Sequence, residues 1–327
     1  MWEHADKDVS VGVDVDGVAE TLVSVLPILM LMALGVVLRV SRVLDDVAVD
    51  ALKKLVVNVV LPAVLFNAFL VVDFTAEYLT LLLIVPAVCL LLLALGHLAR
   101  RILPGHRTVT PYLFTGFEFG MLGIALFTAA FGVASVPLMG MVGLGHEFFI
   151  WFVFVTLLRR TMEGAVPMRQ MLASFVSSPL IIAIAAGLLL NLLGLGTILA
   201  GVPIGAAVLE TVSLVAAIIV PVILIIVGHG TRLSRAGVWQ AAPLVAARFS
   251  VTLTLALLLN HFVVSGWLGL PPVAEAAVFT LLILPPPFIV PIFLPRSRRE
   301  GITYANNVLS LHTVVTLIAF VTYIALV

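Results

Sequence analysis

Long apolar runs, separated by short polar connections, make up almost the whole chain. This pattern constrains the fold more than any single motif. Most of the runs are close to the roughly 20 residues that a helix needs to cross a bilayer. A lipid-facing span must satisfy its own backbone hydrogen bonds, so helix is the expected conformation. We therefore predict an all-α integral membrane protein with ten transmembrane helices. The ten runs fall near residues 21–39, 51–72, 78–99, 109–132, 138–158, 176–195, 204–228, 239–263, 274–294 and 303–326.

Composition supports a membrane protein. The chain has 327 residues, of which 62% are hydrophobic and 10% are charged, whereas soluble domains are roughly 25% charged. The single cysteine, Cys89, excludes a disulfide framework and a cysteine-based metal cluster. Residues 1–20 are acidic and lack the basic start of a cleaved signal peptide. We interpret them as a short acidic N-terminal tail.

The basic residues predict the orientation of the spans. Lys and Arg follow the first, third, fifth, seventh and ninth runs, and the other connections contain none. Because cytoplasmic loops are enriched in Lys and Arg, both termini are predicted to lie on the non-cytoplasmic side of the cell membrane. These residues are Arg39, Arg42, Lys53, Lys54, Arg100, Arg101, Arg107, Arg159, Arg160, Arg169, Arg232, Arg235, Arg296, Arg298 and Arg299.

The chain contains a weak internal repeat. Pro27 and Gly35 in the first run have the same spacing as Pro179 and Gly187 in the sixth. A proline also lies inside both the second and the seventh run. A five-span unit that occurs twice has opposite orientations in its two copies, which is typical of secondary transporters. The predicted repeats are residues 21–162 and 163–327.

The ninth run is interrupted by three consecutive prolines, Pro285, Pro286 and Pro287. Proline lacks an N–H and clashes with the preceding helical turn, so this run cannot be one continuous helix. Broken backbone at membrane depth is tolerated only where protein or a water-filled cavity satisfies the freed carbonyls. The fourth run, its counterpart in the repeat, is rich in glycine, including Gly120 and Gly123. We predict that the interrupted fourth and ninth runs form the two halves of the substrate site.

Two charged residues lie deep inside apolar runs. Glu118 is about ten residues into the fourth run, roughly 15 Å deep at 1.5 Å per residue, and Arg248 has a similar depth in the eighth. One interpretation is a buried ion pair that fixes helix packing. The other, which we favour, is that Glu118 carries protons or contacts substrate while Arg248 neutralises an anionic group of the substrate.

Two further polar groups are candidates for proton coupling. Glu147 lies in the fifth run next to His146, and His312 lies at the corresponding place in the tenth. For Glu147, packing and proton relay are equally supported. His312 has hydroxyl neighbours, which favours a hydrogen-bonded packing role, although a proton-coupling role is retained as a candidate.

Several segments, taken together in their order and spacing, resemble the auxin efflux carrier family of membrane transporters. Residues 55–66 (Leu-Val-Val-Asn-Val-Val-Leu-Pro-Ala-Val-Leu-Phe) are similar to its second-span signature, and residues 178–187 to the start of its second half. Pro221 with Gly228 resembles its seventh span, and residues 306–317 its last. The resemblance implies two inverted five-helix repeats, crossing broken helices 4 and 9, and elevator-like movement of spans 3–5 and 8–10 against spans 1, 2, 6 and 7.

The fourth run departs from the pattern of that family. Its usual asparagine is replaced by Glu118, and the proline that follows is replaced by Ala125. A neutral amide that contacts substrate has thus become an ionisable group.

These observations predict a secondary active transporter of a small organic anion, such as a carboxylate, coupled to protons or driven by membrane potential. A sodium-coupled carrier like the bile acid:sodium symporters is the alternative with the same fold, and a non-transporting membrane sensor or scaffold is the alternative from another class. Signatures of metalloproteases, serine hydrolases and nucleotide-binding loops are absent from the sequence. No enzymatic activity, cofactor, metal or nucleic acid is predicted. Expected partners are membrane lipids and a second copy of the chain, through spans 2 and 7.

Overall fold

A computed structural model describes residues 15–71, 76–162, 169, 172–173, 176–231, 234–295 and 297–326. The described residues form helices and connecting turns, without strands. Residues 1–14 of the predicted acidic tail lie outside them, as do Arg232 and Arg296 from the predicted cytoplasmic loops.

The first half of the chain supplies helices to the five apolar runs predicted there. They are α1 (Val15–Val40), α2 (Asp46–Leu55), α3 (Leu61–Leu70), α4 (Ala76–Ile102), α5 (Thr110–Leu113), α6 (Ile124–Phe131), α7 (Val136–Phe149) and α8 (Val155–Met162). Short π-helical turns η1 (Val56–Val60), η2 (Phe119–Gly123) and η4 (Ile150–Phe154) and the 3₁₀ turn η3 (Val133–Ser135) connect some of them.

The second half also supplies helices to its five predicted runs, with interruptions in the sixth and the ninth. Its helices are α10 (Pro179–Leu192), α11 (Leu195–Gly201), α12 (Pro203–Ala217), α13 (Ile219–Gly230), α14 (Arg235–Leu259), α15 (Pro272–Ile283) and α16 (Arg299–Leu326). The π-helical segment η5 (Asn260–Ser265) extends α14, and the 3₁₀ turn η6 (Val290–Phe293) follows the proline run.

Within the described chain, five helical segments are long and apolar enough to cross a membrane. A bent pair, α10 with α11, makes a sixth if it counts as one span. Three shorter apolar helices include Phe119–Phe131 and Pro272–Ile283, which are short because the backbone breaks inside the fourth and ninth runs. The chain is thus consistent with a multi-pass membrane protein.

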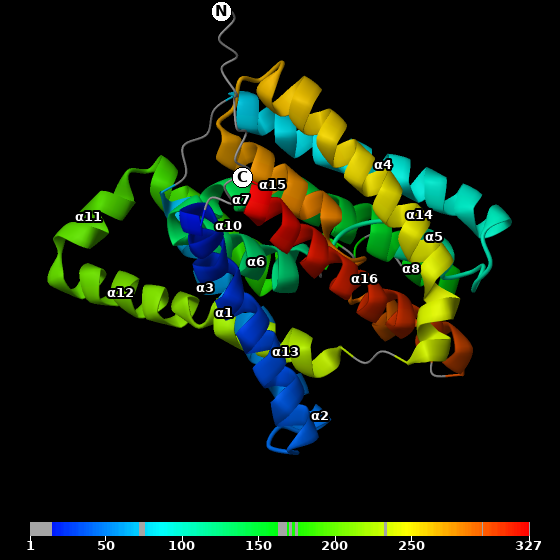
Figure 1. Ribbon diagram of the computed structural model, residues 1–327. Helices are drawn as coiled ribbons and strands as arrows, with labels where there is room; N and C mark the ends of the chain where they lie inside the picture. The colour runs from blue at the N-terminus through cyan, green and yellow to red at the C-terminus, as the bar shows by residue number, and fades with distance from the viewer. Residues whose placement is uncertain are drawn as a thin grey trace, which may run out of the picture.

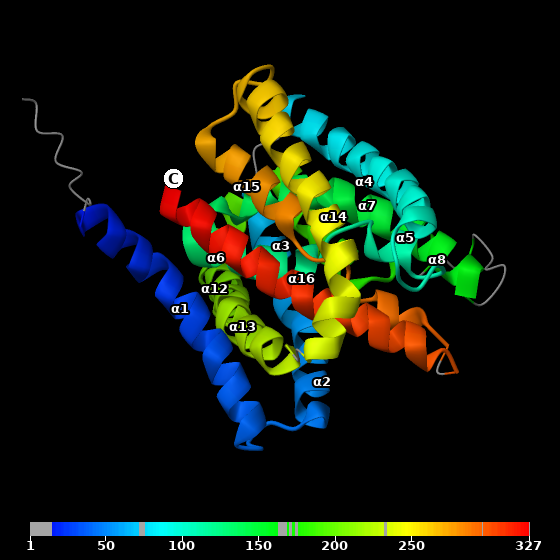
Figure 2. The same ribbon diagram turned by 45° about the vertical axis from the view of Figure 1, so that its right-hand side comes forward.

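The helices pack in pairs around two central segments. α1 packs against α13, α10 against α3, α4 against α7, and α14 against α16. Figures 1 and 2 show α6 and α15 in the middle of the molecule, between these pairs. The turn from α1 to α2 lies at one end and the connection from η5 to α15 at the other in both views. The fold therefore places the two predicted breaks at its centre.

Glycines allow the backbones of α1 and α13 to touch. A Cβ atom added at Gly228 would lie 2.0 Å from the carbonyl oxygen of Met32, and one added at Gly35 would lie 2.2 Å from that of Ile225. At the end of the same contact, the guanidinium of Arg39 donates to the carbonyls of His229 (2.6 Å) and Thr231 (2.8 Å) and caps α13. The close approach requires glycine, as small residues do at membrane helix crossings.

Gly228→Ala is expected to destabilise the protein by about 1–3 kcal/mol, because its methyl group has to push α1 away from α13. The matched control is Gly230→Ala on the same helix, where an added Cβ meets nothing within 4 Å. Melting temperatures of both detergent-purified variants are the measurement. Equal melting temperatures would contradict the close contact between α1 and α13.

Candidate functional site

The proline run interrupts the ninth apolar segment. α15 ends at Ile283, residues 284–289 are not helical, and η6 follows. The carbonyls at this end of α15 find partners outside their own helix. Ile283 accepts from Thr316 Oγ1 (2.6 Å), Leu284 from Arg248 Nη1 (2.9 Å), and Pro285 from the backbone N–H of Glu118 (2.8 Å). Protein groups thus satisfy these freed carbonyls, as buried backbone requires.

The fourth apolar segment is broken as well. α5 ends at Leu113, residues 114–118 are not helical, and η2 and α6 continue the chain. Gly116 has a φ of +70°, in the left-handed region that favours glycine. Its carbonyl accepts from Arg248 Nη2 at 2.6 Å, and the next N–H, of Phe117, donates to His146 Nε2 at 2.9 Å. Gly116 was not predicted as a residue of the site. Its position two residues before Glu118, in a glycine-rich run, is the sequence signal that could have indicated it.

Arg248 ties the two breaks together. Its side chain is fully buried, and its guanidinium donates to one carbonyl from each broken segment, those of Gly116 and Leu284. Its Cζ also lies 5.3 Å from the centre of the Phe117 ring. Within the described chain no ion pair joins Arg248 to Glu118. Arg248 therefore holds the two broken segments together. Its hydrogen bonds go to these carbonyls and to His312, and the predicted neutralisation of a substrate anion stays a prediction.

Glu118 bridges the same two segments from the other side. Its carboxylate accepts from the backbone N–H of Phe288 (2.5 Å), which follows the prolines, and from that of Met121 (3.4 Å) in η2. Glu118 thus lies at the N-terminal end of the half-helix Phe119–Phe131. Helix N-termini carry unpaired N–H groups and a positive dipole end, so they favour negative charge. The carboxylate occupies an anion-binding position built from both breaks.

The other predicted residues of the crossing have packing roles. Gly123 is buried, and a Cβ there would lie 2.6 Å from Leu284 Cδ1. Gly120 is half-buried and would place a Cβ 3.1 Å from Leu61 Cδ2. Pro286 and Pro287 are buried, as is Pro285. The glycines therefore let side chains of the second break and of α3 approach η2 closely.

His312 is fixed by Arg248. Its Nε2 lies 2.7 Å from Arg248 Nη1, and its Nδ1 lies 3.3 Å from Thr316 Oγ1. A guanidinium only donates, so Nε2 must be the unprotonated nitrogen of a neutral ring. Protonation of Nε2 would break this bond, so a proton-coupling role for His312 requires the crossing to rearrange.

His146 and Glu147 lie behind the first break. His146 is buried, and its Nδ1 is 3.4 Å from Glu147 Oε1, without the geometry of a hydrogen bond. The other carboxylate oxygen of Glu147 accepts from Trp151 Nε1 at 3.1 Å. Glu147 is also close enough to Glu118 for their charges to interact. The structure thus brings two acidic side chains near the crossing.

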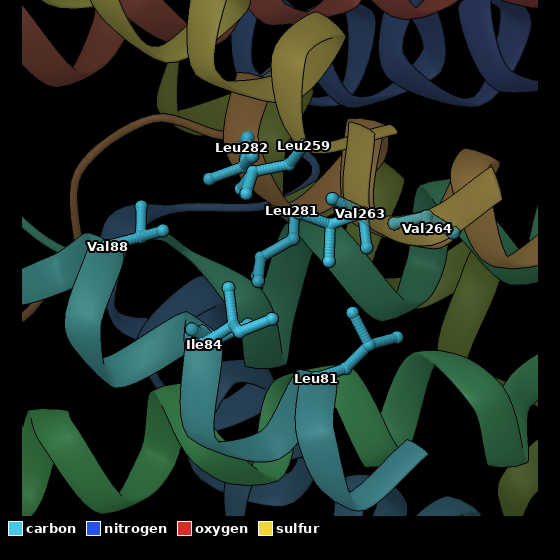
Figure 3. Close-up of a pocket in the computed structure, with 10 residues that line it drawn as sticks. Leu81, Ile84, Val88, Leu259, Val263, Val264, Leu281 and Leu282 are labelled. Carbon is cyan, nitrogen blue, oxygen red and sulfur yellow. The ribbon is translucent and has the colours of Figure 1, made fainter. Parts of the chain in front are cut away.

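Two mainly apolar cavities of the described residues lie outside the crossing. The first, shown in Figure 3, is lined by aliphatic side chains of α4, α15 and the end of α14 with η5, including Ile84, Leu259 and Leu281. Such a lining has no group that would orient a charged ligand. The second, of about 500 Å³, lies between α3, α12 and the η3–α7 region, with Asn67 and Ser213 in its wall.

Neither a known protein-family profile nor a curated protein matches the chain.

Proposed function

We propose that the protein is a secondary active transporter that carries a small organic anion, such as a carboxylate, across the cell membrane together with a proton. The observation that carries the proposal is the junction at Glu118, whose carboxylate and backbone N–H both bond to the second broken segment. Two broken helices that meet at membrane depth are typical of transporter binding sites.

The helix pairings support an inverted repeat of five spans. In the proposed numbering, α1 packing on α13 is span 1 on span 7, and α10 packing on α3 is span 6 on span 2. Because the repeat relates span 1 to span 6 and span 2 to span 7, these two pairs correspond to each other. The repeat likewise relates α4 on α7 (spans 3 and 5) to α14 on α16 (spans 8 and 10). The proposed elevator has spans 3–5 and 8–10 as its moving part, and spans 1, 2, 6 and 7 as a scaffold.

The half-buried side of the crossing faces that scaffold. η2, which contains Gly120, contacts η1 and α13, and the side chains of Glu118 and Phe288 are half-buried. A substrate held there would lie between the moving part and the scaffold. Displacement of the moving part would then expose it to either side of the membrane.

The chemistry of the junction couples substrate to protons. The N–H groups of Met121 and Phe288 suit a carboxylate, but the carboxyl oxygens of Glu118 already accept from them, and in its ionised form Glu118 carries a negative charge at this place. A substrate carboxylate placed beside it would be repelled by like charge. Protonation of Glu118 removes that repulsion and frees one of the two donors, because the protonated carboxyl keeps one carbonyl oxygen that accepts. Anion and proton would therefore bind together, and we assign the relay of the proton to Glu147, the acid whose charge acts on Glu118.

Reconstituted protein tests the proposal. We expect liposomes with an alkaline interior to accumulate a radiolabelled monocarboxylate, without a requirement for sodium. One proton per monovalent anion makes the cycle electrically neutral, so a potassium-diffusion potential should leave the uptake rate nearly unchanged. The substrate is first chosen from an organic-acid panel by thermal stabilisation of the purified protein.

Three results would redirect the assignment. A strict sodium requirement would indicate the sodium-symporter alternative. Uptake that follows the membrane potential and ignores the pH gradient would indicate potential-driven transport. Ligand-induced stabilisation without flux in sealed vesicles would indicate a sensor.

A further inference from the structure

A basic cavity lies well away from the crossing, where α4, the loop to α5, and the end of α8 meet. Figure 1 shows these three elements together at one side of the molecule. The cavity is open to solvent, has a volume of about 400 Å³, and has Arg100, Arg101 and Arg107 in its wall. Thr108, Tyr112 and Thr161 add hydroxyl groups. This composition differs from that of the aliphatic cavity in Figure 3.

The charge in this cavity is unbalanced within the described chain. Its described lining contains no carboxylate, and the ion pairs found among the described residues do not include its three arginines. Three guanidinium groups around one space repel one another, and an anion between them removes that repulsion. The net positive charge of the cavity lining therefore favours a negatively charged ligand.

The floor of the cavity is rigid. Tyr112 is buried, and its hydroxyl donates to the carbonyl of Leu157 at 2.9 Å and contacts Thr161 Oγ1. Thr161 Oγ1 in turn donates to the same carbonyl at 2.8 Å. These bonds hold α5 against α8, so the cavity is a feature of the fold rather than a gap between loose side chains.

Arginines and hydroxyls together suit a phosphate group. Guanidinium binds phosphate oxygens through paired N–H donors, and the hydroxyl of Thr108 supplies a further donor. Exposed apolar side chains at the same level of α4 indicate a lipid as the source of that phosphate. Leu98 and Ile102, on the last turns of α4, are 52% and 69% exposed. An acyl chain lying along this face would leave its headgroup at the level of the arginines, as basic pockets at the cytoplasmic side of membrane helices do.

We propose that this cavity binds the phosphate of an anionic phospholipid. The bound lipid would bridge α4, α5 and α8 at the start of the fourth run. Inorganic phosphate shares the same chemistry, and the experiment distinguishes the two sources. The proposal is independent of the transported substrate.

The test uses the full-length protein in nanodiscs and in detergent. We expect native mass spectrometry to show retained phosphatidylglycerol at least fivefold more often than phosphatidylcholine at equal mole fractions. Arg107→Gln, on an exposed loop position, should reduce this preference by more than half, and Arg101→Gln should do the same. Lys54→Gln, an exposed basic residue of α2 outside the cavity, should leave it unchanged.

Thermal shift with millimolar inorganic phosphate separates the sources. Little stabilisation by phosphate, together with stabilisation by phosphatidylglycerol that both arginine variants lose, supports a lipid headgroup site. Stabilisation by phosphate without a lipid preference would overturn the lipid source. Equal lipid retention by the native protein, both arginine variants and Lys54→Gln would overturn the site itself.

Discussion

Arg248→Met is expected to disrupt the crossing and abolish transport. Methionine replaces the apolar stem of the side chain, but it leaves the carbonyls of Gly116 and Leu284 without their donors. Each unpaired buried acceptor costs about 1–3 kcal/mol, so we expect a loss of about 3 kcal/mol or more. His312 Nε2 loses its donor as well. The melting temperature of the purified variant and its uptake rate in liposomes are the measurements.

Two milder variants separate charge from geometry at the same place. Arg248→Lys keeps a positive charge, but one ammonium cannot reproduce the forked donors that reach two broken segments. We expect it to be nearly as inactive as the methionine variant. Thr316→Val removes the bonds of the hydroxyl to the Ile283 carbonyl and to His312 Nδ1 but leaves the guanidinium in place, and it should cost about 1–2 kcal/mol. Native-like stability and transport in Arg248→Lys would show that a positive charge alone suffices. That result would contradict the requirement for a guanidinium that donates to both broken segments.

The positions of the two breaks were predictable from residue chemistry. Three successive prolines cannot continue a helix, so the end of α15 just before Pro285 follows directly from the sequence. The glycines around Glu118 indicated the other break. Helix in the ten apolar runs was equally predictable, because a lipid-facing backbone has few other conformations.

The length of the helices was harder to predict. Ten runs suggested ten spans, whereas five helical segments of the described chain reach spanning length by themselves. The breaks account for Phe119–Phe131 and Pro272–Ile283, each of which is only part of its run. Hydropathy averages over a break, so it does not distinguish a broken span from a continuous one.

The partners of the buried charges could not be predicted. Sequence gives the depth of Arg248 in its helix, but not which groups lie opposite it. Its partners include the carbonyls of Gly116 and Leu284. Every residue has a main-chain carbonyl, so the charges of the side chains do not indicate which carbonyls an arginine will contact. The bond from Phe288 N–H to Glu118 was hidden for the same reason. Charge pairing suggested an ion pair, and the described structure instead uses each charge to satisfy broken backbone.

Glu118→Gln is expected to uncouple transport from protons while preserving binding. Glutamine resembles protonated glutamate, since it is neutral and retains a carbonyl oxygen that accepts from Phe288 or Met121. In the native protein, rising pH ionises Glu118, which then competes with the substrate for these donors. Apparent affinity should therefore fall up to tenfold per pH unit once Glu118 is ionised. The variant should bind the anion with similar affinity between pH 5 and pH 8.

Transport by Glu118→Gln separates this role from a structural one. Exchange of labelled for unlabelled anion should continue at a rate within about threefold of the native protein, whereas accumulation driven by a pH gradient should be lost. The ionisable group whose charge acts on the Glu118 carboxylate is Glu147, which itself lies beside His146; Arg248 and His312 contact each other and the broken backbone. Glu147→Gln is therefore the matched control, since it removes the nearby acid but leaves the bonds between the two breaks intact. An unchanged pH profile in Glu118→Gln, together with a lost profile in Glu147→Gln, would move proton coupling to Glu147 and leave Glu118 as a clamp between the broken helices.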